Sequence, residues 1–317
     1  LDFFTDCSLL QYAEEEFDWN RKALLRGKSV IDKVLQWTSS SKAPPLTLRV
    51  SRDKKLATRA AAIYEAVFSY MEGGRREYLC AALSILHGGK EELCDEVYAQ
   101  VVRQTSNNPS QESEDRGWRV LLVLSAFVAP SRRFLPYLMS YVTSGLDNDA
   151  GVAPLVAEIA AHKIMVISRQ GPRRNMLCDT ELESLLSIDV GGNAAITLKV
   201  WYVDGKYSNF RVDSWSTIAE LNAQAVARLG LQYSQSFALF DVSSKGTERV
   251  LSPSERVLDI VSSWNSSSHE PKKKIGPRGG GLHGGSGSSS SRSGSGDGRS
   301  SSSNSDGRGS SSSSSSS

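Results

Sequence analysis

The spacing of apolar residues changes partway along the chain, and this change constrains the fold more than any other feature. From about residue 8 to about residue 168 the apolar residues recur every three to four positions, which predicts amphipathic helices. The clearest stripe runs from Leu56 to Met71 and stops at the Gly73-Gly74 pair, a common kind of helix end. Further helices are expected within 29–37 and from residue 93, and short turns between helices predict an all-α domain.

A helix after residue 131 carries a start signal and one irregularity. Ser131 is the predicted N-cap of RRFLPYLMSYV, because a serine hydroxyl accepts a hydrogen bond from the first helical turn. Pro136 falls inside this stretch, where proline removes a backbone donor and disturbs a helix. We therefore expect a helix that begins after Ser131 and is disturbed at Pro136.

Beyond about residue 180 the pattern becomes that of strands. AITLKVWYV (195–203) and KYSNFRV (206–212) flank the pair Asp204-Gly205. Asp-Gly tolerates the positive φ angles of a type I′ turn, so this stretch predicts a β-hairpin.

The residues after the hairpin predict a helix, a strand and a second helix. Thr217-x-x-Glu220 is a capping box that opens the first helix, with Gly230 past its end. FALFDV (237–242) reads as a strand, and the run from Ser252 to Glu255 supplies an N-cap, a proline and a glutamate for a second helix. This order fits a small sheet crossed by one helix, the ubiquitin-like β-grasp (α+β) fold, over about 185–264.

From residue 266 onward the chain consists largely of serine and glycine. Such a composition buries too little apolar surface to offset the entropy of ordering, so we expect a disordered tail. PKKKIGPRGGG (271–281) is its basic run and faintly resembles an RNA-binding RGG element. A nucleic-acid-binding protein acting through this tail is therefore an alternative, although one arginine in a glycine run more often belongs to a linker.

Composition bounds the setting of the protein. The chain holds 37 basic and 35 acidic residues, so its net charge of +2 indicates no particular partner. The cysteines, at positions 7, 80, 94 and 178, form no C-x-x-C pair and indicate a reducing, cytoplasmic setting. The longest apolar run, 120–129, is well short of the ~20 residues that span a bilayer. The first residue is leucine, and we expect a fragment of a longer protein.

No pattern in the sequence predicts catalysis, a cofactor or a metal site. Cys80, His87 and Cys94 lie seven residues apart, whereas zinc ligands usually include closer pairs. A metalloenzyme using these three residues is the least favoured alternative. Asp95 and Glu96 are adjacent, so on a helix their side chains diverge by about 100° and do not form a facing acid and base.

One stretch resembles a known domain signature. LCDEVYAQVVRQTSNNP (93–109), followed by RGW (116–118) and APS (129–131), is similar to the signature of the MyTH4 domain. The matching residues are Asp95, Glu96, Tyr98, Gln100, Gln104, Pro109, Gly117, Trp118, Pro130 and Ser131. The resemblance implies that the polar residues tie helices together, that Trp118 anchors the core, and that none of these residues is catalytic.

The resemblance continues on both sides of this signature. LQYAEEEF (10–17) and PPLTL (44–48) resemble earlier elements of the same domain, and GPRR (171–174) resembles the linker into a FERM module. It implies a MyTH4 helical domain at 8–168, a linker at 169–184, the ubiquitin-like first FERM lobe at 185–264 and a disordered tail at 265–317. The expected multidomain chain thus lacks the later FERM lobes and a preceding motor head.

Tandems of this kind occur in tails of unconventional myosins of the myosin-VII and myosin-XV type, in plant kinesins and in adaptors. The resemblance implies a non-catalytic module, associated with the cytoskeleton, that binds adhesion-receptor tails, other cargo or microtubules. A myosin parent is the first reading, and a kinesin or adaptor parent is the alternative. No cofactor is implied.

A local excess of positive charge predicts where an acidic partner, such as a tubulin tail, would bind. Residues 42–59 carry six basic side chains against a single acid, Asp53, a local net charge of +5. The six are Lys42, Arg49, Arg52, Lys54, Lys55 and Arg59. Two alternatives remain open: the acidic run at 14–18 folds against these residues and cancels their charge, or they form a solvated loop.

Overall fold

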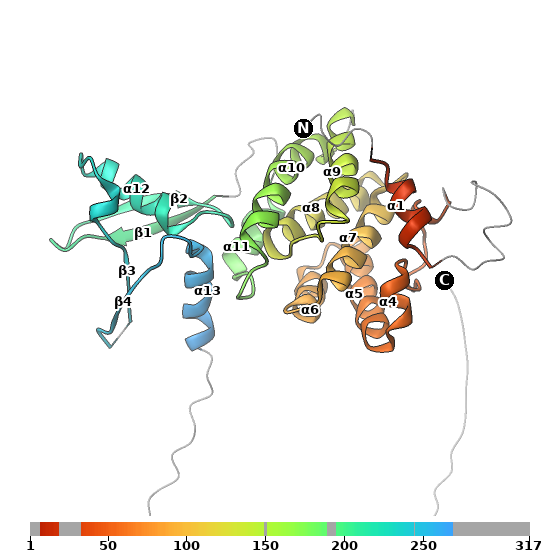
Figure 1. Ribbon diagram of the computed structural model, residues 1–317, viewed down its shortest axis with the longest axis horizontal. Helices are drawn as coiled ribbons and strands as arrows, with labels where there is room; N and C mark the ends of the chain where they lie inside the picture. Colours follow the sequence, from red (N-terminus) through yellow and green to blue (C-terminus); the bar gives the residue numbers. More distant parts are fainter. Residues whose placement is uncertain (1–6, 19–32, 149–150, 189–194, 244, 269–317) are drawn as a thin grey trace, which may run out of the picture. The chain divides into compact units, whose positions relative to one another are not determined.

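The computed structural model describes residues 7–18, 33–148, 151–188, 195–243 and 245–268, with the side chains of 265–268 left aside. Its first part is helical (Figure 1). The helices are α1 (Leu9–Glu16), α4 (Leu48–Arg52), α5 (Lys54–Gly73), α6 (Arg76–Leu86), α7 (Glu91–Thr105), α8 (Gln111–Phe127), α9 (Leu135–Ser144), the 3-10 turn η2 (Gly145–Asp147), α10 (Ala153–Gln170) and α11 (Asp179–Leu186). Helix α11 thus lies mostly in the segment expected as a linker, and it packs on α8.

Helix α7 runs through the middle of the helical part. It packs against α4, α5, α8 and α9, and every side chain from Leu93 to Thr105 is buried. Such a helix must also bury its polar residues, and a buried polar group requires a hydrogen-bond partner. The second half of α8, from Val120 to Phe127, is buried throughout and packs beside α7.

The second part is an α+β lobe. Its elements are β1 (Ile196–Trp201), β2 (Tyr207–Val212), α12 (Ile218–Arg228), the 3-10 turn η3 (Ser234–Ser236), β3 (Phe240–Val242), β4 (Glu248–Val250) and α13 (Val257–Ser268). β1 pairs antiparallel with β2, and β3 with β4, as two separate two-stranded sheets in the described residues. Phe210, Val212, Leu221 and Leu258 belong to a core separate from that of the helices.

The start of α9 differs from the prediction. The helix begins at Leu135, and the Ser131 hydroxyl accepts from the backbone N–H of Phe134 at 3.0 Å in a single turn before it. Pro136 is therefore the second helical residue, where the first-turn N–H groups have no partner within the helix. The expected disturbance at Pro136 was wrong, because proline there removes no helical hydrogen bond.

The hairpin turn also differs from the prediction. Gly205 has a φ of 80°, but Asp204 does not have a positive φ, so the turn is not of type I′. The N–H of Tyr202 donates to the carbonyl of Lys206, which closes a longer loop. Within this loop the Asp204 side chain accepts from the N–H of Lys206 at 3.0 Å.

The run Ser252–Glu255 is a turn and not the start of a helix, and α13 begins at Val257. Here a remote partner overrides the local signal. The carbonyls of Pro253 and Glu255 accept from the first N–H groups of α12, and Val257 donates to the carbonyl of Ser216. The strand expected at 237–242 is likewise limited by a partner outside it. Its ladder with β4 comprises Phe240, Asp241 and Val242, so β3 begins at Phe240.

Two expectations fall wholly or partly outside the described residues. The helix predicted within 29–37 is described from residue 33 and shows helical geometry at 33 and 34 alone. The tail, with its basic run at 271–281, lies outside the described residues.

Several buried polar side chains join the helical part to the lobe. Arg173, fully buried, donates to Glu181 at 2.5 Å and to Asp259 of α13 at 2.6 Å. Trp215 donates through Nε1 to the carbonyl of Ser125 on α8 at 2.9 Å. The ion pairs of Arg173 thus hold the segment 171–186 to α13, and the Trp215 bond holds the lobe to α8.

Candidate partner-binding site

The site is organised by Glu96, a carboxylate with no exposed surface. Its oxygens accept from the backbone N–H groups of Leu46 and Thr47 and from the Thr47 hydroxyl, each at 2.7 Å. Gln100 adds a fourth donor at 2.7 Å. Hydrogen bonds to an ionised group are stronger than neutral ones, so Glu96 fixes the backbone just before α4 without an ion pair.

The two glutamines extend this hold along the same segment. Gln100 donates to the carbonyl of Pro44 at 3.3 Å. Gln104 donates to the Tyr64 hydroxyl at 2.8 Å, and that hydroxyl donates to the carbonyl of Ser40 at 2.7 Å. Residues 40–47 are thus tied to α7 at both ends.

Asp95 and Tyr98 hold the opposite side of α7. Asp95 accepts from the backbone N–H of Ser131 at 2.8 Å, and Tyr98 donates to the carbonyl of Val128 at 2.9 Å. Both bonds fix the chain around Pro130, which is itself buried. The acidic pair therefore faces two different segments, as the 100° divergence on a helix requires.

The remaining signature residues pack the core. Trp118 is 2% exposed and stacks on Tyr141 with ring centroids 5.6 Å apart. A Cβ on Gly117 would lie 2.4 Å from Thr105 Cγ2 and 2.7 Å from Met71 Cε, so only glycine permits this approach of α8 to α5 and α7.

The six predicted basic residues come from the loop at 42, α4 and α5. Lys42, Arg52, Lys54 and Lys55 are exposed and form no ion pair with any described residue. Arg59 belongs instead to the packing of α5 on α6, because its Nη2 donates to the carbonyl of Ile85 at 2.5 Å. We call the four exposed unpaired cations the basic face.

The acidic run of α1 reaches one of the six predicted cations. Glu16 pairs with Arg49 at 3.6 Å and with Arg133 at 2.6 Å, and Glu15 also reaches Arg133. Among the six predicted cations, cancellation by the acidic run therefore applies to Arg49. The basic face keeps its charge.

Two features of this region were missed by the sequence reasoning. Lys90 lies close enough to Asp53 for its charge to act on that carboxylate. The pKa of Asp53 is lowered mainly by the hydrogen bond from the N–H of Leu56, and the charges of Lys90 and Lys55 lower it further. Lys90 is 31 positions beyond the predicted cluster, and no spacing rule links the two. The second feature is a pocket beside the basic face.

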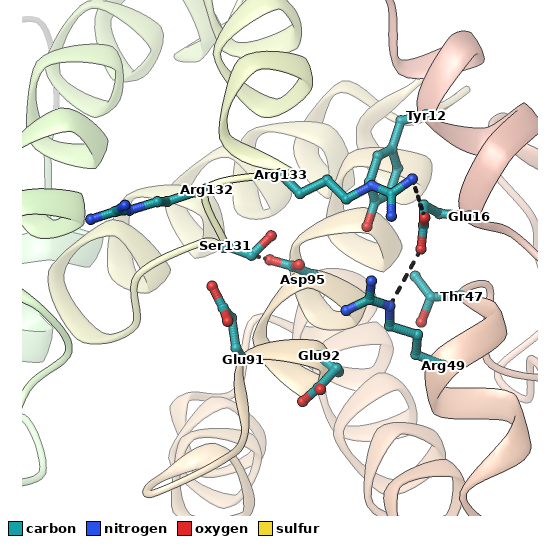
Figure 2. A pocket seen from close by; sticks show the side chains of 10 residues that line it. All are labelled: Tyr12, Glu16, Thr47, Arg49, Glu91, Glu92, Asp95, Ser131, Arg132 and Arg133. Carbon is teal, nitrogen blue, oxygen red and sulfur yellow. Dashed lines mark hydrogen bonds and ion pairs between the residues drawn. The ribbon is translucent and has the colours of Figure 1, made fainter.

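The pocket has a volume of about 440 Å³ and lies between α1, α4, the start of α7 and the turn at 131–133 (Figure 2). Arg49 and Arg133 stand on one side, both held by Glu16, and Asp95 and Glu91 stand on the other. Burial raises the pKa of Asp95 to about 6, against the lowering effect of its bonds to Ser131.

Cys94 and His87 are placed for packing. Burial raises the pKa of the Cys94 thiol to about 12, which leaves it protonated and unreactive at neutral pH. His87 stacks on Phe127, and its Nε2 lies 3.1 Å from the carbonyl oxygen of Arg174. No group of three His, Cys, Asp or Glu side chains suited to a metal occurs among the described residues. Over the same part of the chain, no helix combines the length and apolarity needed to cross a membrane.

Comparison with known proteins assigns both parts. The family description "MyTH4 domain" matches residues 82–184, and "RA like domain" matches residues 194–278. Human unconventional myosin-XVB is 26% identical over 247 residues, covering 75% of this chain and 8% of that protein. The kinesin-like protein KIN-14I of Oryza sativa subsp. japonica is 26% identical over 212 residues, covering 62% of this chain and 16% of that protein.

Solved structures share the fold. The MyTH4-FERM MF1 domain of Dictyostelium discoideum myosin VII (mutant 2) superposes with a TM-score of 0.70 at 20% identity, covering 84% of this chain and 54% of that one. The human myosin 7b C-terminal MyTH4-FERM domain, solved in complex with the harmonin-a PDZ3 domain, gives 0.63 at 20% identity, covering 83% and 52%. Domains of these two types are non-catalytic modules for protein and cytoskeleton interaction. The chain therefore contains a MyTH4 domain, matched over residues 82–184, followed by an RA-like (FERM-like) domain, matched over residues 194–278.

Proposed function

We propose that this chain is a cytoskeletal interaction module from the tail of an unconventional myosin and that microtubules are one of its partners. An unconventional myosin among its relatives supports the parent, and a kinesin-like relative keeps a kinesin-type or adaptor parent as the alternative. Because the chain covers a small share of either relative, the parent, its cytoplasmic location and its cargo are all parts of the proposal.

The observation that carries the microtubule proposal is the basic face. Lys42, Arg52, Lys54 and Lys55 stay exposed, and the bonds of Glu96, Gln100 and Gln104 hold the loop before α4 in place. A preformed cluster of like charges attracts a flexible acidic segment with little ordering cost on its own side. The acidic tails of tubulin have this chemistry.

Co-sedimentation of the 317-residue chain with microtubules tests the proposal. The double variant Lys54→Glu/Lys55→Glu should lose most of its binding. Binding by the unmodified chain should fall steeply between 50 and 200 mM salt, because charges screen over ~8 Å at physiological ionic strength. The melting temperature of the double variant should equal that of the unmodified chain, since exposed charges contribute only ~0–1 kcal/mol to folding.

The matched control is Arg228→Glu/Lys245→Glu, which makes the same charge change at exposed sites of the α+β lobe. It should bind like the unmodified chain. Equal binding by both double variants, or binding that survives removal of the tubulin tails with subtilisin, would rule out the basic face as the contact.

Adhesion-receptor tails are a second proposed partner class, and the α+β lobe offers a surface for them. Trp201 and Tyr207 are 63% and 49% exposed on the β1–β2 hairpin, with Lys199 Nζ 4.3 Å from the Tyr207 ring centroid. Exposed aromatic residues beside a cation are common in protein interfaces. A receptor peptide that binds the chain should bind Trp201→Ser at least about tenfold more weakly, and unchanged affinity would exclude this surface.

The division at 8–168, 169–184, 185–264 and 265–317 is also part of the proposal. Limited proteolysis of the whole chain should cut first at 265–317. Early cuts inside 8–168 at the described helices would contradict it.

A further inference from the structure

The Asp95 pocket holds a buried carboxylate without a counter-ion. Asp95 is 7% exposed, and both the backbone N–H and the side chain of Ser131 hydrogen-bond to it. The charge of Arg49 also favours its ionised form, but no cation lies within ion-pair distance of it among the described residues. An ionised group removed from water is costly unless it is paired. Asp95 therefore has more to gain from a cationic ligand than any other group around the pocket.

A second observation points into the same space. The Tyr12 side chain is 4% exposed, and its hydroxyl makes no hydrogen bond to another described residue. In Figure 2 this hydroxyl points into the pocket, toward the space between Asp95 and Arg49. A buried hydroxyl that opens onto a pocket is a hydrogen-bonding group available to a ligand.

The positive side of the pocket is already engaged. Arg49 and Arg133 share Glu16 and are 59% and 52% exposed, so water and that carboxylate satisfy them. On the other side Glu91 turns toward Asp95 and adds a second negative charge. Arg132 also lines the pocket, but its side chain points away from Asp95 in Figure 2. The charge left without an ion-pair partner beside Asp95 is therefore negative.

We propose that the Asp95 pocket receives an arginine or lysine side chain from a protein partner, with Asp95 and Glu91 as its counter-ions and the Tyr12 hydroxyl as a further contact. A volume of about 440 Å³ lies within the roughly 300–1,000 Å³ of ligand pockets, and a basic side chain with its flanking backbone fits it. Arg49 and Arg133 then stand where an acidic neighbour in the partner segment would lie. This site is separate in chemistry from the basic face, which attracts acidic segments.

The test uses the 317-residue chain and three capped pentapeptides, Gly-Gly-Xaa-Gly-Gly, with Xaa arginine, its neutral isostere citrulline, or glutamate. Amide chemical shifts of residues 91–95 and 131–134 report occupancy by NMR. The arginine peptide should shift these amides saturably, and citrulline should bind about tenfold more weakly, the loss of roughly one ion pair.

Variants assign the effect to residues. Asp95→Asn keeps an oxygen for the Ser131 N–H and removes the charge, so it should weaken the arginine peptide about tenfold, and Tyr12→Phe should weaken it less. Asp147→Asn, at an exposed site away from the pocket, is the matched control and should change nothing. Where Asp95→Asn does not fold, Glu91→Gln decides, with a loss of about threefold expected.

Equal binding of arginine and citrulline would overturn the proposal. Shifts with the glutamate peptide alone would also overturn it and would assign the pocket to anions held by Arg49 and Arg133. Folded Asp95→Asn that binds like the unmodified chain, or no shift at 20 mM arginine peptide, would have the same effect.

Discussion

At the scale of single residues, the charge on Asp95 works against folding. Its pKa is about 6 in the folded chain against 3.8 for the ordinary group, so the folded state holds its proton over a range where the unfolded state has released it. The stability contributed by this difference is present below pH ~4 and is lost as pH rises through about 6. At neutral pH the penalty is about 2–3 kcal/mol, at 1.36 kcal/mol for each unit of pKa.

We therefore expect Asp95→Asn to be more stable than the unmodified chain at pH 7.5, by up to about 2–3 kcal/mol. At pH 4 the two should unfold at nearly the same urea concentration, because the unmodified carboxyl is then protonated. Urea unfolding at both pH values measures the difference. A variant that is less stable at pH 7.5 would show that the hydrogen bond to Ser131 outweighs the cost of the buried charge.

Glu96 is the opposite case, since four donors satisfy its charge. Glu96→Ala would leave the N–H groups of Leu46 and Thr47 buried without acceptors, at about 1–3 kcal/mol each. We expect the free energy of unfolding to fall by at least about 3 kcal/mol. Glu91→Ala, on the exposed side of the same helix, should change it by less than about 0.5 kcal/mol. Similar losses in both variants would remove the special role of Glu96.

At the scale of elements, Gly117 sets how closely α8 approaches α5 and α7. Gly117→Ala would force its Cβ against Thr105 Cγ2 and Met71 Cε, and overpacking of this kind costs about 1–3 kcal/mol. The added change Thr105→Ser removes the nearer methyl group and should recover part of the loss. A double-mutant cycle by urea unfolding measures this coupling, and strictly additive effects would argue against the contact.

Local signals predicted element ends where the bonding partner is also local. The capping box at Thr217 and Glu220 is present as predicted, because both partners lie within three residues. Ser252 carries a similar signal, but the carbonyls that follow it bind the start of α12 instead. A sequence pattern contains the first kind of information and not the second.

The same distinction separates the predicted from the missed parts of the site. The basic face was predicted because its members fall within 42–55, a single continuous segment. The Asp95 pocket combines residues from α1, α4, α7 and the turn at 131, so Tyr12 and Arg133 are joined to it only by tertiary packing. Charge along the chain predicted the first, and only the fold could bring together the second.

At the scale of the whole molecule, Arg173 joins the helical part to the α+β lobe. Removing it would deprive Glu181 and Asp259 of their ion pairs and leave Arg256, whose charge also acts on both carboxylates, as a nearby cation. Breaking a buried pair in this way costs about 3–5 kcal/mol. We expect Arg173→Ala to unfold in two calorimetric transitions, with the lobe first. Arg174→Ala, an exposed neighbour, is the control and should unfold like the unmodified chain. A single unshifted transition in Arg173→Ala would show that the lobe is held by other contacts.

The partners of Glu96 and Asp95 also have a consequence for how the chain folds as it is synthesised. Glu96 bonds to Leu46 and Thr47, which the ribosome has already made, whereas Asp95 bonds to Ser131, 36 residues later. At about 5–20 residues per second the wait lasts roughly two to seven seconds. During this interval α7 can dock on α4 and α5 but not complete its other side. The nascent helical part should therefore expose one apolar flank of α7 during this interval, and a chaperone that binds this flank would protect it until Ser131 has been made.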